Sequence, residues 1–165
     1  MADTKVFDAI MAMLQTEDIQ FRHLHHEPTY TSEDSARVRG ESTMIGGKSL
    51  LMKIGDSFKL FVVSAALKLD SRAIKDYFHE KYFRFATREE LMEMTGLYSG
   101  SVPPFGRPIL DFDLFIDNSV TKNERIAFNA GSLEDSIIMQ TPDYLKLVER
   151  SQPIFFDFSE KVSGS

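Results

Sequence analysis

The 165-residue sequence contains no cysteine. This absence excludes disulfide bonds, thiolate metal ligands and a thiol nucleophile, so any covalent chemistry must use oxygen or nitrogen. The chain also has no apolar run approaching the ~20 residues that a membrane-spanning helix needs. Its N-terminus, MADTKVFDAI, carries acidic residues where a secretory signal is basic. We therefore expect a cytoplasmic protein with no membrane partner.

Positive charge is scarce as well. The chain has 19 Lys and Arg against 25 Asp and Glu, which gives a formal net charge of −6. Nonspecific nucleic-acid binding needs a cationic surface, so this balance disfavours it, and DNA is not an expected partner. Basic residues nevertheless outnumber acidic ones between Arg37 and Arg84. A basic face on an otherwise acidic protein would suit a partner that binds at that face alone.

Hydrophobic residues make up 42% of the chain and aromatic residues 12%, which argues against disorder. The length suffices for one compact domain with a sizeable core. We find no internal repeat and no low-complexity tract. The sequence therefore predicts a single domain over residues 1–165, with a short flexible tail over residues 160–165.

Helix signals recur along the chain. Apolar residues from Val6 to Leu14 follow helical spacing and predict a helix that ends near Thr16. Capping residues predict four further helices. These are SEDSARVR between Thr31 and Gly40, SRAIKDYFHE after Asp70, a helix from the capping box at Thr87 to Gly96, and PDYLKLVER with Thr141 as N-cap and Pro142 in its first turn.

Strand signals lie between the helices, in IQFRHLHH, KSLLMKI, FKLFVVSAAL, KYFRFA, ILDFDLFID, RIAFNAG, DSIIMQ and PIFFDF. Gly55-Asp56 predicts a hairpin between the second and third of these strands. The interspersed pattern with short turns favours the α+β class, with a mixed, curved and barrel-like sheet flanked by helices. GLYSGSVPPFGRP holds three of the nine glycines and three of the six prolines and predicts an exposed loop.

The stretch Gly46-Gly47-Lys48-Ser49 superficially suggests a nucleotide-phosphate loop. That motif, G-x-x-x-x-G-K-[ST], needs a glycine at position 42, where Ser42 stands. A phosphate loop also leads from a strand into a helix, whereas Lys48 precedes a predicted strand. We therefore reject this interpretation. Lys48 is then either a solvated surface residue or the charged centre of another kind of site.

Four segments in this order resemble one known family: HEPTYTSEDSARVRG, then GGKSLLMK with FKLFVVSAALKLD, then GLYSGSVPPFG, then FNAGSLEDSIIMQTPDYLKL. They are similar to the editing domains inserted in, or related to, bacterial prolyl-tRNA synthetase. The resemblance runs from about His26 to Asp157. Free-standing members, often called YbaK-like, are trans-editing aminoacyl-tRNA deacylases. Their fold is an α+β domain with a mixed sheet, in agreement with the pattern above.

The resemblance implies a deacylase that acts on the acceptor end of mischarged aminoacyl-tRNA. It also implies a synthetase as a candidate second partner and no metal or organic cofactor. Lys48 would hold the phosphate of the terminal adenosine, and backbone N–H groups of Gly100 and Ser101 would stabilise the oxyanion. The substrate's ribose hydroxyl is thought to assist the attack in this family. The implied substrate-binding residues are Thr31, Gly96, Val102, Pro103, Phe105, Gly131 and Ser132.

Other interpretations of the same residues stay open. The domain could be a noncatalytic module that binds tRNA or a synthetase, or a hydrolase of small-molecule esters. Ser101 is not expected to be a nucleophile, because the G-x-S-x-G motif is absent. His23 and His25 would share one strand face, but they lack a clear third ligand, so no metal site is expected.

Overall fold

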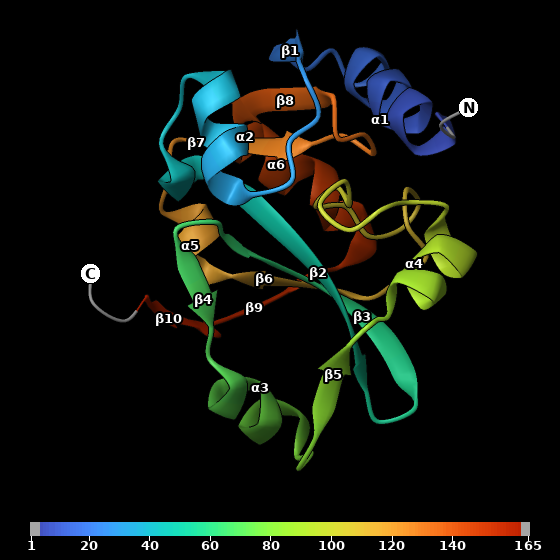
Figure 1. Cartoon of the computed structure of the whole chain (residues 1–165), viewed down its shortest axis with the longest axis vertical. Helices are drawn as coiled ribbons and strands as arrows, with labels where there is room; N and C mark the ends of the chain where they lie inside the picture. The colour runs from blue at the N-terminus through green and yellow to red at the C-terminus, as the bar shows by residue number, and fades with distance from the viewer. Residues whose placement is uncertain (1–3, 163–165) are drawn as a thin grey trace.

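The computed structural model describes residues 4–162 and shows helices and strands interspersed along the chain (Figure 1). The helices are α1 (Lys5–Thr16), α2 (Ser32–Arg39), α3 (Ser71–Phe78), α4 (Arg88–Thr95), α5 (Asn118–Thr121) and α6 (Thr141–Val148). The strands are β1 (Phe21–His25), β2 (Gly47–Ile54), β3 (Ser57–Ser64), β4 (Leu67–Leu69), β5 (Phe83–Phe85), β6 (Leu114–Asp117), β7 (Arg125–Asn129), β8 (Asp135–Gln140), β9 (Ile154–Phe156) and β10 (Ser159–Lys161). The predicted α+β class is confirmed.

The largest sheet has five strands in the order β5-β2-β3-β6-β9. β2 pairs antiparallel with β3 and β5, whereas β6 pairs parallel with β3 and β9, so the sheet is mixed, as predicted. The β2–β3 hairpin turns at Gly55, whose φ of +62° favours glycine. The predicted hairpin at Gly55-Asp56 is therefore confirmed.

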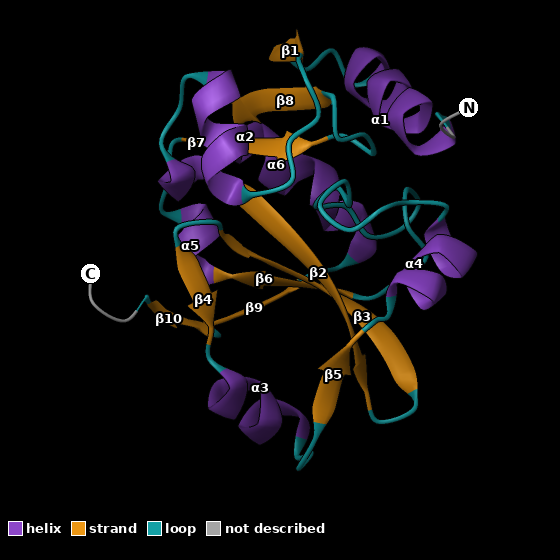
Figure 2. Cartoon of the chain, viewed as in Figure 1, coloured by secondary structure: helices purple, strands orange, loops and turns teal. Residues whose placement is uncertain are grey.

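The remaining strands form two smaller sheets, and the expected barrel-like closure is not seen. β1, β8 and β7 make a three-stranded antiparallel sheet, and β10 pairs with β4. Within residues 4–162 no sheet closes on itself. Figure 2 shows the three-stranded sheet with α1, α2 and α6 at one end of the molecule. A single parallel bridge between Gly46 and Ala127 joins the start of β2 to β7.

Glycine allows this junction to form. A Cβ atom on Gly47 would lie 2.8 Å from Cδ1 of Ile126, and one on Gly46 would lie 2.9 Å from Cβ of Ala65. Contacts this short require a neighbour to shift, so a larger residue at either position would disturb the packing of this segment against Ala65 or Ile126. Gly46 and Gly47 therefore fix the position of Lys48, the next residue along the strand.

Side-chain caps set most helix ends as expected. The Thr31 hydroxyl accepts a hydrogen bond from the Asp34 N–H, and Gly40 ends α2 with a left-handed conformation. Asp70 caps α3, and Thr87 forms the complete capping box of α4 with Glu90.

The prediction for the start of α6 is wrong by one residue. The N-cap is Gln140, and Thr141 is already the first helical residue, with its hydroxyl unpaired. The reason is that β8 runs directly into α6, so its last residue keeps an extended backbone and serves as the cap. Pro142 does lie in the first turn of the helix.

Several strand boundaries also differ from those predicted; FKLFVVSAAL, for example, is a strand only to Ser64, and Leu67 begins β4. ILDFDLFID forms a strand only from Leu114 onward, because residues 109–113 turn. At the C-terminus, residues 160 and 161 of the expected tail belong to β10, where they pair with Lys68 and Leu67. Residues 163–165 of that tail lie outside the described part of the chain.

The segment predicted as an exposed loop is a loop, but much of it is buried. Residues 101–106 all lie in the interior. Proline lacks an N–H group, so Pro103 and Pro104 leave fewer backbone donors to satisfy. The neighbouring carbonyl groups are paired: Gly100 O accepts from Asn129 Nδ2, Ser101 O from Gly131 N, and Pro104 O from Tyr144 Oη. These pairs remove the usual cost of burying a loop.

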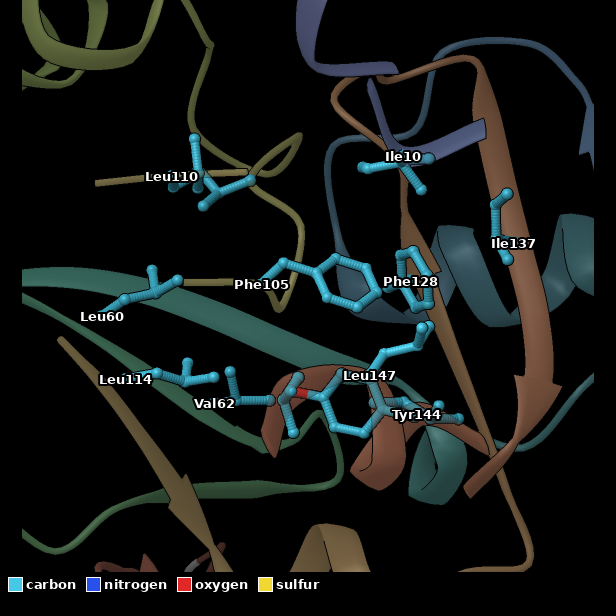
Figure 3. Close-up of a cluster of buried hydrophobic side chains, with 14 of the residues drawn as sticks. Ile10, Leu60, Val62, Phe105, Leu110, Leu114, Phe128, Ile137, Tyr144 and Leu147 are labelled. Atoms are coloured by element: carbon cyan, nitrogen blue, oxygen red, sulfur yellow. The ribbon is translucent and has the colours of Figure 1, made fainter. Parts of the chain in front are cut away.

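Phe105 anchors this loop in the main hydrophobic core. Its ring lies 5.4 Å from that of Phe128 and 5.5 Å from that of Tyr144, both edge to face. Figure 3 shows Phe105 and Phe128 pointing toward one another among buried side chains from α1, β3, β8 and α6. The core therefore holds the loop rigidly against β7.

Candidate functional site

A pocket of about 470 Å³ opens between the start of α2, the start of β2, the loop before Val102 and the end of β7. Its lining includes Thr31, Arg39, Lys48, Gly100, Val102 and Asn129. These residues are spread over about a hundred positions in the sequence. The fold brings them together because the Gly46–Ala127 bridge sets β2 beside β7, and because Asn129 binds the loop.

Lys48 is the second residue of β2 and pairs with Val63 of β3. Its side chain is exposed at the pocket and forms no hydrogen bond or ion pair with another residue of the described chain. Lys68, which also lines the pocket, lies 3.4 Å from a carboxylate oxygen of Glu160. Lys48 is therefore a cation at the pocket whose charge is available to a ligand.

The loop has unused backbone donors at the pocket. Gly100 has a φ of +89°, a conformation that favours glycine. The N–H groups of Gly100 and Val102 make no hydrogen bond to another described residue, and both residues line the pocket. The Val102 N–H belongs to the same peptide as the Ser101 carbonyl, which accepts from the Gly131 N–H at 2.9 Å, so the plane of that peptide is fixed. Fixed donors of this kind can stabilise a negative oxygen without reorganising.

Ser101 is placed differently from its two neighbours. Its N–H donates to the carbonyl of Tyr98 at 3.1 Å, and its hydroxyl donates to the same carbonyl at 2.8 Å. The residue is only 2% exposed and does not line the pocket. Both polar groups that were expected to serve the site therefore stabilise the turn of the loop.

Five other residues implied by the resemblance do not line the pocket. Gly96 ends α4 with a φ of +73°. Pro103 and Phe105 are buried in the loop. Gly131 donates its N–H to the Ser101 carbonyl at 2.9 Å, and the Ser132 hydroxyl accepts from the Glu134 N–H at 3.0 Å. The pocket itself thus gathers Thr31, Lys48, Gly100 and Val102 of the ten implied residues.

Four polar residues that were not predicted from the sequence form the floor of the pocket. Thr29, Ser35, Arg39 and Asn129 line the pocket and are each less than a tenth exposed. Arg39 donates from Nε to the Ser136 hydroxyl at 2.9 Å and from Nη2 to Oδ1 of Asn129 at 3.0 Å. A signal was present, because Ser35 and Arg39 are four residues apart and so share one face of a helix. Nothing in the sequence showed that this face is buried.

Burial lowers the pKa of Arg39 to about 10. The cause is desolvation, because low-polarity surroundings disfavour the charged form of the guanidinium. A pKa of this size still leaves the group charged at neutral pH. The floor of the pocket therefore carries a positive charge in addition to Lys48.

The histidines of the N-terminal segment lie beside the pocket rather than in it. His23 Nε2 and His25 Nδ1 contact the same oxygen of Asp135, at 2.8 and 3.0 Å. This contact raises the pKa of His25. His26 donates from Nδ1 to the Glu27 carbonyl and contacts the Ser136 hydroxyl through Nε2. Across residues 4–162 no group of three His, Asp or Glu side chains is arranged to hold a metal ion.

The fold and the pocket together define an α+β domain with a polar cleft, in which a free cation faces a rigid loop of backbone donors. The family model described as "Aminoacyl-tRNA editing domain" matches residues 26–147. The chain therefore belongs to the aminoacyl-tRNA editing domain family, and the resemblance seen in the sequence is confirmed.

Individual relatives agree with this assignment. The chain is 28% identical over 149 residues to the multifunctional Ser/Thr-tRNA deacylase ProXp-y of Escherichia coli, covering 85% of this chain and 86% of that protein. It is 22% identical to the prolyl-tRNA editing protein ProX of Acetoanaerobium sticklandii, over 93% of this chain and 96% of that protein. Both relatives are named for tRNA deacylation or editing.

A solved structure shares the fold. The crystal structure of a putative trans-editing enzyme for prolyl tRNA synthetase superimposes with a TM-score of 0.78 over 94% of this chain and 98% of that one, at 22% identity. No helix in the described part of the chain has the length and apolar character needed to cross a membrane.

Proposed function

We propose that this protein is a trans-acting aminoacyl-tRNA deacylase, which hydrolyses the ester between a mischarged amino acid and the terminal adenosine of tRNA. One observation carries the proposal. In a member of the editing-domain family, a single pocket brings the unpaired cation of Lys48 to the free N–H groups of Gly100 and Val102. A positive charge and fixed donors are what an anionic polynucleotide carrying an activated ester requires.

Lys48 fits the role of a phosphate contact. The polynucleotide must leave the pocket toward solvent, so its terminal phosphate stays near the rim, where the Lys48 side chain is exposed. An ammonium group acts as a point charge on phosphate and fixes the register of the substrate without reading its sequence. The acceptor end of tRNA is therefore the part that this protein recognises in our proposal.

The Gly100–Val102 loop fits the role of an oxyanion site. Water, assisted by the neighbouring ribose hydroxyl, adds to the ester carbonyl carbon, and the carbonyl oxygen becomes negative. The bond from that carbon to the ribose oxygen then breaks, and the ribose oxygen takes up a proton. Free amino acid and uncharged tRNA are the products. Each fixed donor to such an oxygen typically contributes about 100- to 1000-fold in turnover.

The polar floor favours an amino acid with a hydrogen-bonding side chain. A buried site built to bond a hydroxyl rejects analogues without one, because its own polar groups are then left unpaired. Thr29 supplies such a group, because its buried hydroxyl accepts from the Ser35 hydroxyl at 2.9 Å and donates to no other residue of the described chain. The E. coli relative is named a Ser/Thr-tRNA deacylase. We propose serine and threonine as the amino acids that this protein removes.

A panel of charged tRNAs tests this function. Purified protein is incubated with seryl-, threonyl-, alanyl- and prolyl-tRNA, each on a cognate and a noncognate tRNA, and ester loss is followed over time. The proposal expects rapid release of serine or threonine and slow release of alanine and proline. Tight tRNA binding with no ester loss would instead show a noncatalytic module. Hydrolysis of free aminoacyl esters without tRNA binding would show a small-molecule hydrolase.

Association with a synthetase stays a prediction. A region of the proline–tRNA ligase of Bacillus licheniformis, 23% of that enzyme, matches 81% of this chain at 28% identity. In that protein the similar domain is part of a synthetase, which supports a synthetase as a candidate partner here. Co-sedimentation with a purified prolyl-tRNA synthetase, with and without tRNA, checks this expectation.

A further inference from the structure

Arg39 is a buried cation that no acidic side chain neutralises. The residue is 9% exposed, and its two hydrogen bonds go to neutral oxygens of Ser136 and Asn129. It forms no ion pair within the described chain, and Nη1 donates no hydrogen bond there. Part of the guanidinium is therefore without a partner, although the group is charged and removed from water.

Two arginines that are more exposed than Arg39 are nevertheless neutralised by carboxylates. Arg84 binds both oxygens of Glu90, at 2.7 and 2.9 Å. Arg125 binds both oxygens of Glu41, at 2.6 and 3.0 Å. Burying an ion without an opposite charge costs several kcal/mol. A purely structural link between α2, β7 and β8 would not need a charge, so the cationic form of Arg39 calls for a further explanation.

The unused donors of Arg39 lie beside the reactive part of the pocket. A Cβ atom built on Gly46 would lie 3.8 Å from Nη1, which places this nitrogen next to the start of β2. Nη2 is joined to the loop through one side chain, because Asn129 accepts from Arg39 and donates to Gly100. Arg39 thus stands at the pocket floor near both Gly46 and Gly100.

The depth of Arg39 decides which part of a substrate it meets. Phosphate groups stay with the polynucleotide at the rim, near the exposed Lys48. The ester is at the end of the chain and is the part that enters the pocket. The negative charge that an aminoacyl ester develops there is on its carbonyl oxygen, during attack by water.

On the basis of the proposed deacylase function, we propose that Arg39 is a catalytic residue, whose Nη1 donates to the ester carbonyl oxygen as it becomes negative, together with the loop N–H groups. No proton leaves Arg39 in this step. Its guanidinium keeps its charge throughout and stabilises the tetrahedral intermediate more than the neutral ester. The effect therefore falls on kcat rather than on KM.

Steady-state deacylation of seryl-tRNA separates this role from a structural one. The variants are Arg39→Gln, Arg39→Lys and the control Arg125→Gln, an arginine of β7 that does not line the pocket. We expect Arg39→Gln to lower kcat by about 100- to 1000-fold with KM changed less than about 3-fold, and Arg39→Lys to recover part of the loss. Arg125→Gln should keep the wild-type kcat. An unchanged kcat in Arg39→Gln, or a rise in KM alone, would overturn the proposal.

A binding measurement tests the same role without relying on turnover. Two stable analogues of 3′-seryl-adenosine are titrated calorimetrically: a phosphonate, whose tetrahedral anion resembles the intermediate, and a neutral amide. Wild-type protein should prefer the phosphonate, and Arg39→Gln should lose at least about 10-fold of that preference while Arg125→Gln keeps it. An equal preference in wild type and Arg39→Gln would reject the role of Arg39. Because no tRNA is hydrolysed, this result stands apart from failure of the deacylase proposal.

Discussion

The side-chain amide of Asn129 donates a hydrogen bond of 2.8 Å to the carbonyl oxygen of Gly100. Oδ1 of the same side chain accepts from Arg39 at 3.0 Å and from Ser136 at 3.2 Å. One buried residue at the end of β7 therefore holds the loop and the floor of the pocket in a single network. The position of Gly100 in the loop therefore depends in part on this side chain.

Replacing Asn129 by alanine should damage the site more than the fold. Without the amide, Gly100 and Arg39 each lose a hydrogen-bond partner, so the loop and the pocket floor can shift. Misplacement of reacting groups by about 1 Å costs on the order of 100-fold in rate. The lost hydrogen bonds should cost about 1–3 kcal/mol of unfolding free energy. Seryl-tRNA deacylation and urea unfolding measure both effects. Asn118→Ala, which removes an exposed bond to Asp157, is the control, and equal kcat in both variants would contradict the assigned role.

Replacing Gly131 should lower the stability of the fold. Its φ is +74°, and a Cβ atom there would lie 2.9 Å from Cγ1 of Val6 and 3.1 Å from the backbone nitrogen of Phe7. Gly40 has a similar φ of +69°, but nothing lies within 4 Å of its added Cβ. Gly40→Ala should therefore cost only the conformational strain, about 1–2 kcal/mol. Gly131→Ala should cost about 1–3 kcal/mol more from overpacking, as measured by urea unfolding. Equal losses of unfolding free energy in the two variants would show that α1 moves to accommodate the added methyl group at no cost.

Ser101→Ala should leave most of the activity. The hydroxyl donates to the Tyr98 carbonyl and does not line the pocket, so it is not placed to attack an ester. Its backbone N–H bond to the same carbonyl remains in the variant. We expect kcat for seryl-tRNA within about 10-fold of wild type, since a neutral hydrogen bond contributes only about 1 kcal/mol. A loss of several thousandfold would establish a nucleophile or a direct donor instead.

Glu90 should stabilise the protein in a pH-dependent way. Hydrogen bonds from Arg84 and from the Thr87 backbone lower the pKa of Glu90 from 4.5 to about 2. A folded-state pKa below the unfolded value gives stability that is present above pH 4.5 and is lost as the pH falls towards 2. Thermal unfolding of wild type and Glu90→Gln should therefore differ at pH 6 and converge near pH 2. For Glu89→Gln, in the same helical turn, the difference in stability from wild type should change less with pH. A difference between wild type and Glu90→Gln that stays constant with pH would contradict the assigned role of Glu90.

Local structure was readable from the sequence where a single side chain decides it. Thr31, Asp70 and Thr87 each cap the helix that their spacing predicts, and Gly55 makes the predicted turn. These signals act over four residues or fewer. The start of α6 was missed because β8 continues into the helix without a break, which makes Gln140 the cap.

The site was only partly readable because burial depends on distant partners. Glycine and proline correctly marked a loop around Gly100, but its burial depends on Asn129, Gly131 and Tyr144, which are 29 to 40 positions away. In the sequence, Arg39 is one of several charged residues of a polar helix, and nothing distinguishes it from the others. Only the packing of α2 against β7 and β8 shows that it is buried and unpaired.

The most direct test of the account concerns Lys48. Deacylation of seryl-tRNA is measured for wild type, Lys48→Ala and Lys53→Ala, a lysine of the same strand that does not line the pocket. A charged contact to phosphate is worth about 1.5–3 kcal/mol, so Lys48→Ala should lower kcat/KM by about 10- to 100-fold, with Lys53→Ala near wild type. The slope of log(kcat/KM) against log salt concentration should also become shallower by roughly one in Lys48→Ala, because one fewer counterion is released on binding. Equal kcat/KM values for wild type and Lys48→Ala would contradict the account.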